Sequence, residues 1–404
     1  HHSCMPSHDG HRPTLTGWAS RMKIALIAPP WVPVPPPAYG GTESVVDRLA
    51  RGFAGADHEV LLFASGDSTC PVPRSSLSDR SDDLTIGATA PELRHVLRAY
   101  EAAVDFDVIH DHTVLGPVLA ARRPQPAVVV TTSHFPFDER YREIYRAISG
   151  SVPIIAISGA QASSARGIAI AEVIHHGVDL DAFPVGHGDG GYYLYLGRMA
   201  PYKGALQAAL VARTAGVRLL IAAKMRDDLE RRFFAERVAP VLGGGVEFIG
   251  EVTAHERLEL LQGARALLNP IDWPEPFGLV MIEALSCGTP VLASAKGAAP
   301  EIIDHGATGY VCADQAEMVQ YLQRVDELDR AACRAVAEAR FSAARMVESH
   351  LRLYERLLSQ RRRDQALNRA RSGRRASLVA VKVAGPRQLE VQGPAPTAAP
   401  MPPR

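Results

Sequence analysis

The sequence contains few cysteines and no long apolar run. Its cysteines are odd in number, widely separated and form no CxxC pair, which indicates a reducing cytoplasm. They are Cys4, Cys70, Cys287, Cys312 and Cys333. No run approaches the roughly 18 apolar residues of a membrane-spanning helix. The first residues carry His, Pro and Asp where a secretory signal needs an apolar stretch. We therefore expect a cytoplasmic protein that does not span a membrane.

A charge excess of either sign is also missing. Lys and Arg number 44, as do Asp and Glu, so the chain lacks the basic surplus of a dedicated nucleic-acid binder. What is present is an ordinary globular composition, with 47% hydrophobic and 22% charged residues. At roughly 150 residues per domain, 404 residues allow two or three domains.

Short apolar runs alternate with turns and amphipathic stretches from Ile24 onward, which is typical of parallel βαβ units. A polar break at 178–189 divides the pattern into two α/β domains, 22–185 and 186–340. The predicted strands are 24–28, 60–64, 108–110, 127–131 and 154–158 in the first domain, and 192–196, 218–223, 246–249, 266–268 and 291–293 in the second. Two doubly wound sheets facing each other would form a cleft at the carboxyl ends of their strands.

The remaining segments flank these domains. Residues 42–54 repeat apolar side chains at helical spacing, and 66–91 are Ser-, Asp- and Pro-rich and predict a long loop. A last amphipathic helix is expected near 341–358, packed on a domain. We expect the leader 1–21 to lie outside the fold, and the tail 361–404, whose first fifteen residues hold seven Arg, to be disordered.

Two carboxylates follow the predicted strand 266–268. Glu275 lies in a Pro/Gly turn, and Glu283 lies in the helix that starts near Gly278. The first-turn N–H groups of that helix would form an anion site. Glu283 beside it could bind vicinal ribose hydroxyls. Acids near a helix start also occur simply because they interact favourably with the dipole, and spacing alone leaves both interpretations open.

Two cations follow the predicted strand 192–196. Arg198 leaves the strand and Lys203 is expected to open the next helix, where a cation opposes the dipole. A bound anion explains a cation at a helix start better than a contribution to helix stability does, and the diphosphate leaving group of a substrate would fit. A solvated surface pair of cations is the alternative.

In the first domain, Gly40 and Gly41 precede a helix with Thr42 as its expected N-cap. They allow a close ligand approach or form a structural turn, and the GxGxxG spacing is absent.

Histidines occur after two first-domain strands. His134 follows 127–131 and would reach the cleft rim, where it could hydrogen-bond a sugar hydroxyl, although a lone histidine is often structural. His110-Asp111-His112 looks like a metal triplet, yet no third ligand is evident, and we predict no metal site there. The same holds for His175-His176.

These motifs together resemble glycosyltransferase family 4, the retaining enzymes with the GT-B fold. The resemblance spans about Met22 to Leu358. It is carried by EPFGLVMIE (275–283), GRMAPYKG (197–204), YGGTE (39–43) and HHGVDLDAF (175–183). It implies an α/β protein of two Rossmann-like domains facing an interdomain cleft, with the last helix crossing back onto the first domain.

The resemblance also implies roles for individual residues. Glu283 would hold the nucleotide ribose, and Glu275 the hydroxyls of the donor sugar. Arg198 and Lys203 would neutralise the diphosphate, so that no metal or other cofactor is needed. The remaining donor-side positions are Phe277, Gly278 and Leu279, with Gly40 and Gly41 near the phosphates and His134 near the donor sugar.

The implied activity is retaining transfer of a hexose from a UDP- or GDP-sugar to a hydroxyl acceptor. A GT-B epimerase or phosphorylase, or an idle sugar-nucleotide binder, are the alternatives. The Arg-rich tail either contacts the inner membrane face, which would make the enzyme peripheral there, or is a solvated linker. No specific nucleic-acid partner is expected.

Overall fold

The computed structural model describes residues 20–38, 40–76, 78–82, 85–123 and 125–383. It divides the chain into two units, residues 1–355 and 356–404. Most of the predicted leader, Cys4, Tyr39 and the end of the tail lie outside the described residues. Within the described residues, no helix is both long and apolar enough to cross a membrane.

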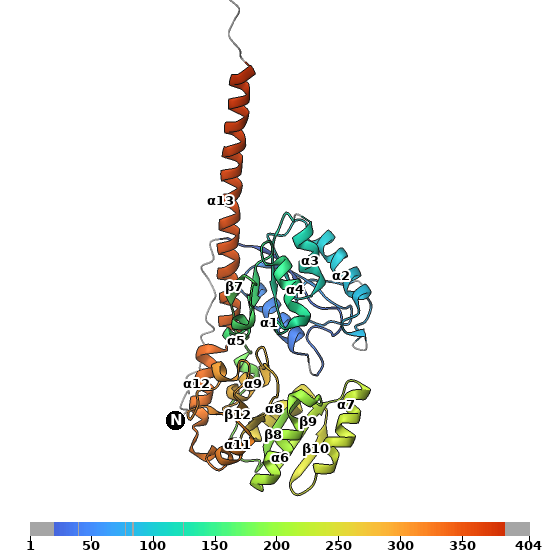
Figure 1. Ribbon diagram of the computed structural model, residues 1–404, viewed down its shortest axis with the longest axis vertical. Coiled ribbons are helices and arrows are strands. Elements are labelled where there is room, and N and C mark those ends of the chain that lie inside the picture. Colours follow the sequence, from blue (N-terminus) through green and yellow to red (C-terminus); the bar gives the residue numbers. More distant parts are fainter. Residues whose placement is uncertain (1–19, 39, 77, 83–84, 124, 384–404) are drawn as a thin grey trace, which may run out of the picture. The chain divides into compact units, whose positions relative to one another are not determined.

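The first half of the larger unit is built on a seven-stranded parallel sheet (Figure 1). Its order is β3-β2-β1-β4-β5-β6-β7. All strands are parallel, and the direction in which successive strands are added to the sheet reverses between β1 and β4. The strands are β1 Lys23–Ile27, β2 Glu59–Phe63, β3 Arg74–Ser75, β4 Val108–Asp111, β5 Val128–Thr132, β6 Ile154–Ala156 and β7 Ile170–Val173. The helices between them are α1 Gly41–Gly55, α2 Thr89–Ala102, α3 Leu115–Arg122, α4 Glu139–Ile148 and α5 Gly159–Ser164.

The second half repeats this architecture with six parallel strands. Its order, β10-β9-β8-β11-β12-β13, is the 3-2-1-4-5-6 order of doubly wound folds. The strands are β8 Tyr193–Arg198, β9 Leu219–Lys224, β10 Val246–Gly250, β11 Leu267–Asn269, β12 Val291–Ser294 and β13 Gly309–Cys312. The α-helices are α6 Ala205–Ala215, α7 Asp228–Phe233, α8 Ala254–Gly263, α9 Leu279–Ser286, α10 Ala299–Ile302, α11 Gln315–Leu322 and α12 Arg330–Arg340. Short helical turns are η2 Leu180–Ala182, η3 Pro201–Lys203, η4 Phe234–Val238, η5 Ala239–Val241 and η6 Val325–Glu327.

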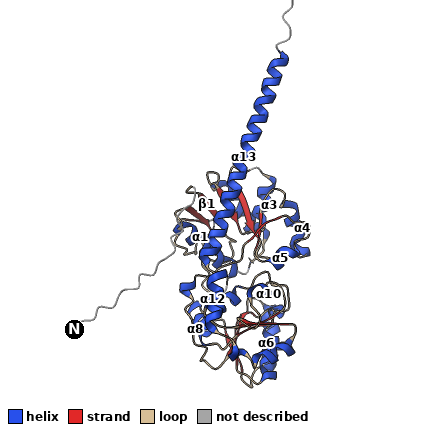
Figure 2. Ribbon diagram, turned by 90° about the vertical axis from the view of Figure 1, so that its left-hand side faces the viewer, coloured by secondary structure: helices blue, strands red, loops and turns tan. Residues whose placement is uncertain are grey.

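Central strands of both sheets are apolar on both faces because helices cover them (Figure 2). All five residues of β5 are buried, and so are Leu267 and Leu268 of β11. Apolar clusters form on the two faces of the second sheet, one packed against α9 and α12 and the other against α6 and α11. The predicted pair of doubly wound domains is therefore confirmed.

Three short strands were not predicted. These are β3, β7 and β13, and the first two are largely exposed and carry charged side chains, so their apolar periodicity is weak. The predicted loop 66–91 contains β3 and the first residues of α2. Gly40, not Thr42, is the N-cap of α1, and it supplies no side-chain cap.

The last helix is longer than expected. Helix α13 spans Ala343–Val383, so the predicted disorder of the tail 361–404 is wrong for residues 361–383. Arg, Gln, Ala and Leu dominate this stretch and favour helix, and no proline interrupts it. In the larger unit, the first turns of α13 contact the first sheet and its helices. There Tyr354 Oη lies 2.6 Å from His110 Nδ1, and Val347 packs close to Gly52 of α1.

Candidate active site

A cavity of about 820 Å³ opens at the carboxyl ends of the strands in the larger unit. Both halves line it. The first half contributes the loop and helix start after β1 and the loops after β4 and β5. The second half contributes the ends of β8 and β9 and the loop between β11 and α9. Each sheet reverses its winding direction between two of these strands, which is where doubly wound sheets bind ligands.

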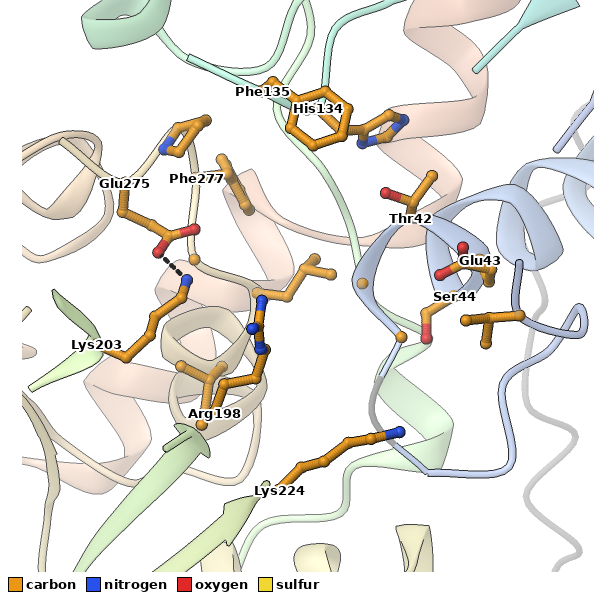
Figure 3. A pocket seen from close by; sticks show the side chains of 18 of the residues that line it. Thr42, Glu43, Ser44, His134, Phe135, Arg198, Lys203, Lys224, Glu275 and Phe277 are labelled. Atoms are coloured by element: carbon orange, nitrogen blue, oxygen red, sulfur yellow. Dashed lines mark hydrogen bonds and ion pairs between the residues drawn. The ribbon is translucent and has the colours of Figure 1, made fainter. Parts of the chain in front are cut away.

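Arg198 is the last residue of β8 and forms an ion pair with Glu230 of α7. Glu230 is buried and also accepts a hydrogen bond from the backbone N–H of Arg226 at 2.6 Å. A carboxylate with two such donors is held in one position. The guanidinium of Arg198 is thereby fixed at the cavity, to which it also contributes lining (Figure 3).

Lys203 ends the turn η3 instead of opening a helix, because α6 begins only at Ala205. Its Nζ lies 2.5 Å from Oε2 of Glu275, the contact dashed in Figure 3. Glu275 also accepts from Trp273 Nε1 at 2.8 Å, and the ammonium lies 4.9 Å from the centre of the Trp273 ring. The predicted sugar-side carboxylate and the predicted phosphate-side cation therefore contact each other directly.

The turn that carries Lys203 requires a glycine at position 204. Gly204 has φ of 94°, a conformation in which side chains are strained. A Cβ there would lie 2.3 Å from the carbonyl oxygen of Pro270. The Lys203 turn therefore packs directly on the backbone that leads into the Glu275 loop.

Glu283 lies on α9, is 4% exposed and lines the cavity. Two guanidiniums are close to its oxygens, Arg257 at 3.6 Å and Arg48 of α1 at 3.8 Å. These distances exceed a hydrogen bond, so the carboxylate retains accepting capacity. Phe277, Gly278 and Leu279 precede it. Phe277 is buried, Gly278 is the N-cap with φ of 91°, and Leu279 begins α9.

The first half presents the start of α1 to the cavity. Gly40 and Gly41 line it, and Thr42, Glu43 and Ser44 follow them (Figure 3). Glu43 is buried, and burial raises its carboxyl pKa to about 7 despite a stabilising backbone hydrogen bond. A carboxyl with a pKa raised in this way carries less negative charge near neutral pH than an ordinary glutamate, so this loop is less negative than the sequence suggests.

His134 lies in the loop after β5 and lines the cavity, as predicted. Its Nε2 is 2.9 Å from Nδ1 of His112, and its ring stacks on His176. Burial lowers its pKa to about 3, with a smaller effect from His350.

The side chains of His110, Asp111 and His112, the triplet considered above as a metal motif, have separate partners. His110 bonds Thr132 and Tyr354, whereas Asp111 accepts from Tyr100 Oη and the Thr113 N–H.

Several charged residues of the site were not predicted from the sequence. Lys224 ends β9 and lines the cavity, as does Arg257 on α8. Lys224 lies 3.9 Å from Glu251. Its place directly after an apolar strand was a usable signal, because the same argument selected Arg198. Arg48 lies inside an ordinary amphipathic helix, and no pattern marks it.

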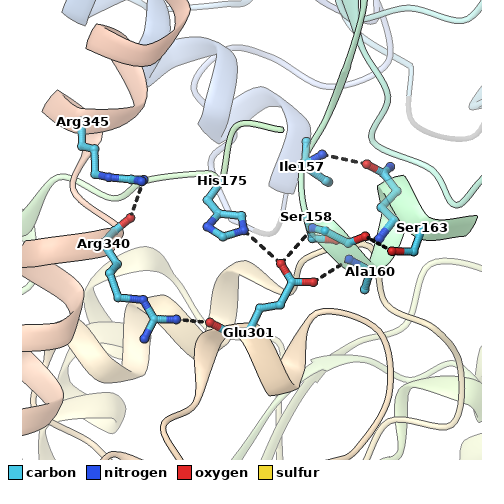
Figure 4. Close-up of polar contacts among 10 residues, drawn as sticks. Ile157, Ser158, Ala160, Ser163, His175, Glu301, Arg340 and Arg345 are labelled. Atoms are coloured by element: carbon cyan, nitrogen blue, oxygen red, sulfur yellow. Dashed lines mark hydrogen bonds and ion pairs between the residues drawn. The ribbon is translucent and has the colours of Figure 1, made fainter. Parts of the chain in front are cut away.

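Glu301 of α10 connects the two halves away from the cavity (Figure 4). Gly159 and Ala160 are the first residues of α5. Their N–H groups donate hydrogen bonds to the Glu301 carboxylate at 2.8 and 2.5 Å. His175 Nε2 is a third neighbour at 3.1 Å. Burial would raise the pKa of Glu301, but these hydrogen bonds outweigh it and lower the pKa.

Replacing Glu301 by alanine is expected to destabilise the protein by about 1–3 kcal/mol, because two backbone donors and a histidine lose their acceptor. Since the folded-state pKa is depressed, the contribution is present above the unfolded pKa and is lost as pH falls through the folded value. Urea unfolding of wild type, Glu301→Gln and Glu301→Ala at pH 7 measures this. Glu301→Gln keeps one acceptor oxygen and should lie between the other two. Equal stability of wild type and Glu301→Gln would contradict the ionic contribution.

Two family models match adjoining parts of the chain. The family described as glycosyltransferase family 4 matches residues 39–182, and glycosyl transferases group 1 matches residues 181–340. A phosphatidyl-myo-inositol mannosyltransferase of Mycolicibacterium smegmatis is 29% identical over 324 residues, which are 71% of this chain and 80% of that protein.

Solved structures show the same architecture. AviGT4, a glycosyltransferase involved in avilamycin A biosynthesis, is 26% identical with a TM-score of 0.64, covering 84% of this chain and 98% of AviGT4. HepE of Anabaena, solved with UDP and glucose, is 21% identical with a TM-score of 0.63, covering 81% of this chain and 98% of HepE.

Two parallel, doubly wound domains with a cavity at their strand ends, matched by these structures, define a glycosyltransferase of the GT-B fold. The chain belongs to the group 1 glycosyltransferases of family 4.

Proposed function

We propose that this glycosyltransferase moves a hexose from a nucleoside-diphosphate sugar to a hydroxyl acceptor, with retention and without a metal ion. The observation that carries the proposal is a pair of fixed cations, Arg198 at the end of β8 and Lys203 in the turn that follows. Both line one cavity together with Glu275 and Glu283. Cations placed where a diphosphate charge develops stabilise the transition state without a metal. The catalytic and donor-binding roles that follow are part of the same proposal.

In the proposed complex, the ribose hydroxyls bind Glu283. Its carboxylate has accepting capacity left by its long contacts to Arg48 and Arg257. The diphosphate lies between Arg198, Lys203 and the N–H groups that start α9, with Phe277, Gly278 and Leu279 shaping this end of the cavity. Glu275 and His134 face the sugar, and the loop of Gly40 and Gly41 lies near the phosphates and the acceptor.

The proposed transfer takes place on one face of the sugar. The bond from C1 to the phosphate oxygen breaks, and a bond from C1 to the acceptor oxygen forms on the same side. The acceptor proton passes to the leaving phosphate. Glu275 is already engaged by Lys203 and Trp273, which favours a role in binding hydroxyls over one as a covalent nucleophile.

The comparisons support the donor class. HepE was solved with UDP and glucose, and the mycobacterial relative is named a mannosyltransferase. We extend the nucleotide-sugar donor from HepE to this chain because the cations and carboxylates described above suit such a ligand.

The test is a panel of UDP-, GDP- and ADP-sugars measured by thermal shift and nucleotide release, with and without EDTA. One donor class should stabilise the protein, and EDTA should not change turnover. No stabilisation by any donor would overturn the proposal. Stabilisation without release in the presence of diverse acceptors would favour an idle binder.

Replacing Glu283 by alanine is expected to weaken nucleotide binding about tenfold to a hundredfold, because an ionised acceptor of the ribose hydroxyls is lost. Isothermal titration with the free nucleoside diphosphate measures this. Glu247→Ala, which removes a half-exposed carboxylate paired with Arg218 outside the cavity lining, is the control and should bind nearly as well as wild type. Unchanged affinity in Glu283→Ala would remove Glu283 from the site.

A further inference from the structure

Five histidine rings form a continuous row from α13 to the cavity. Their consecutive centroid distances are 5.3, 4.0, 5.2 and 5.4 Å. In order, the row consists of His350, His110, His112, His134 and His176. The last three line the cavity. His110 lies in β4, His112, His134 and His176 lie in three different loops, and His350 lies on α13, so this row could not be predicted from the sequence.

His112 and His134 are joined by a hydrogen bond between ring nitrogens. His112 Nδ1 and His134 Nε2 are 2.9 Å apart, so one of the two nitrogens carries the proton. The other nitrogen of His112, Nε2, is buried and has no hydrogen-bond partner among the described residues.

Because His112 Nε2 has no partner among the described residues, it indicates which ring donates the hydrogen bond between His112 and His134. If His134 donated through Nε2–H, a neutral His112 would carry its own proton on Nε2, where the N–H would be buried without an acceptor. An orphaned buried N–H is rarer than an orphaned acceptor. The favoured arrangement therefore has His112 donating through Nδ1–H. A neutral His134 then accepts at Nε2 and carries its proton on Nδ1.

We propose that His112 is a positioning residue that holds His134 as the Nδ1–H tautomer. His134 then donates a hydrogen bond to an oxygen of the transferred sugar and does not accept the proton of the acceptor hydroxyl. The second half of this statement rests on the proposed function, whereas the tautomer is a property of the free protein.

The surroundings hold His112 in place for this task. Its backbone N–H donates to the carbonyl of Ile27 in β1 at 2.9 Å, and its ring lies 4.0 Å from that of His110. His110 is in turn fixed by Thr132 Oγ1 at 2.8 Å and Tyr354 Oη at 2.6 Å. Burial lowers the pKa of both His112 and His134, so both rings are neutral at physiological pH.

The first test reads the tautomer directly. Two-dimensional ¹H–¹⁵N spectra of the full chain, labelled at histidine ring nitrogens and assigned with His134→Gln, report which nitrogen is protonated. We expect a protonated Nδ1 and a bare Nε2 for His134 at pH 7. A proton on Nε2 overturns the inference, whether or not the protein binds a nucleotide sugar.

The second test uses two replacements of His112 that differ in one hydrogen bond. Asparagine carries an N–H donor at the same number of bonds from Cα as Nδ1, and phenylalanine fills the volume without a donor. His112→Phe should lower kcat about tenfold or more with nearly unchanged affinity for the free nucleotide, and His112→Asn should recover most of it. Equal kcat in wild type and His112→Phe would overturn the positioning role.

The two tests separate this inference from the proposed function. Failure of all sugar nucleotides to bind would remove the sugar as the hydrogen-bond acceptor, yet the protonation of His134 Nδ1 would still be measured. Nucleotide-sugar transfer by a protein whose His134 carries its proton on Nε2 would leave the proposed function standing and reject the inference alone.

Discussion

Replacing Arg198 or Lys203 by alanine is expected to lower turnover about a hundredfold to a thousandfold, while nucleotide-sugar affinity falls much less. The reason is that the diphosphate gains charge as the bond to the sugar breaks, so the contacts of both cations strengthen in the transition state. Each variant also leaves a carboxylate without its cationic partner, Glu230 in Arg198→Ala and Glu275 in Lys203→Ala.

Single-turnover rates and equilibrium binding of the donor, measured separately, check this expectation. Glu230→Gln is the matched control for Arg198, since it removes the ion pair but keeps the guanidinium and an acceptor oxygen for the N–H of Arg226. Weaker donor binding with an unchanged single-turnover rate in both alanine variants would mean that the cations stabilise the bound donor and the transition state equally.

Acid is expected to destabilise this protein steeply between about pH 6.5 and pH 4. Burial lowers the pKa of seven described histidines, to about 4 for His95 and His350 and to about 3 for His134. The other four are His58, His110, His112 and His176. An unfolded histidine takes up a proton near pH 6.5. The unfolded state therefore binds more protons in this window, and the folded state loses about 1.4 kcal/mol per pH unit for each group.

Two carboxyls oppose the effect but do not cancel it. Burial raises the pKa of Asp111 to about 6 and that of Glu43 to about 7, so in the folded state they take up protons that the unfolded chain binds only at lower pH. The histidines outnumber these two carboxyls, so a net loss of stability on acidification remains.

Urea unfolding from pH 8 down to pH 5 measures the slope. His350→Phe is the informative variant, because it removes one titrating ring and fills its volume, and its slope should be shallower by about 1.4 kcal/mol per pH unit. A stability that stays flat from pH 8 to pH 5 would show that the histidines accept protons in the folded state.

The sheets could be predicted because their strands are continuous apolar runs. Strands such as β1, β5 and β12 agree with the predicted ranges within a residue or two. The carboxyl ends of such strands point to one edge, so the sequence alone was enough to assign Arg198, Glu275 and His134 to one cavity.

Contacts between segments distant in the sequence could not be predicted. Glu283 and Arg48 are 235 positions apart, and Glu301 meets α5 from 142 positions away. Each of these residues lies on a helix whose local pattern is satisfied without the contact. The ion pair between Arg198 and Glu230 could not be predicted for the same reason, since carboxylates occur in the first turn of many helices.

The packing at Gly204 limits how the enzyme can evolve. The Lys203 turn touches the backbone of Pro270, the N–H of Asp272 donates to the carbonyl of Tyr202 at 2.8 Å, and Glu275 binds the Lys203 ammonium. The loop from Pro270 to Glu275 and the turn from Pro201 to Gly204 therefore hold each other in position. Substitutions that change the shape of this loop, for example to accept another sugar, also displace Lys203. New specificity in this protein is therefore expected to arise through paired substitutions in the two segments.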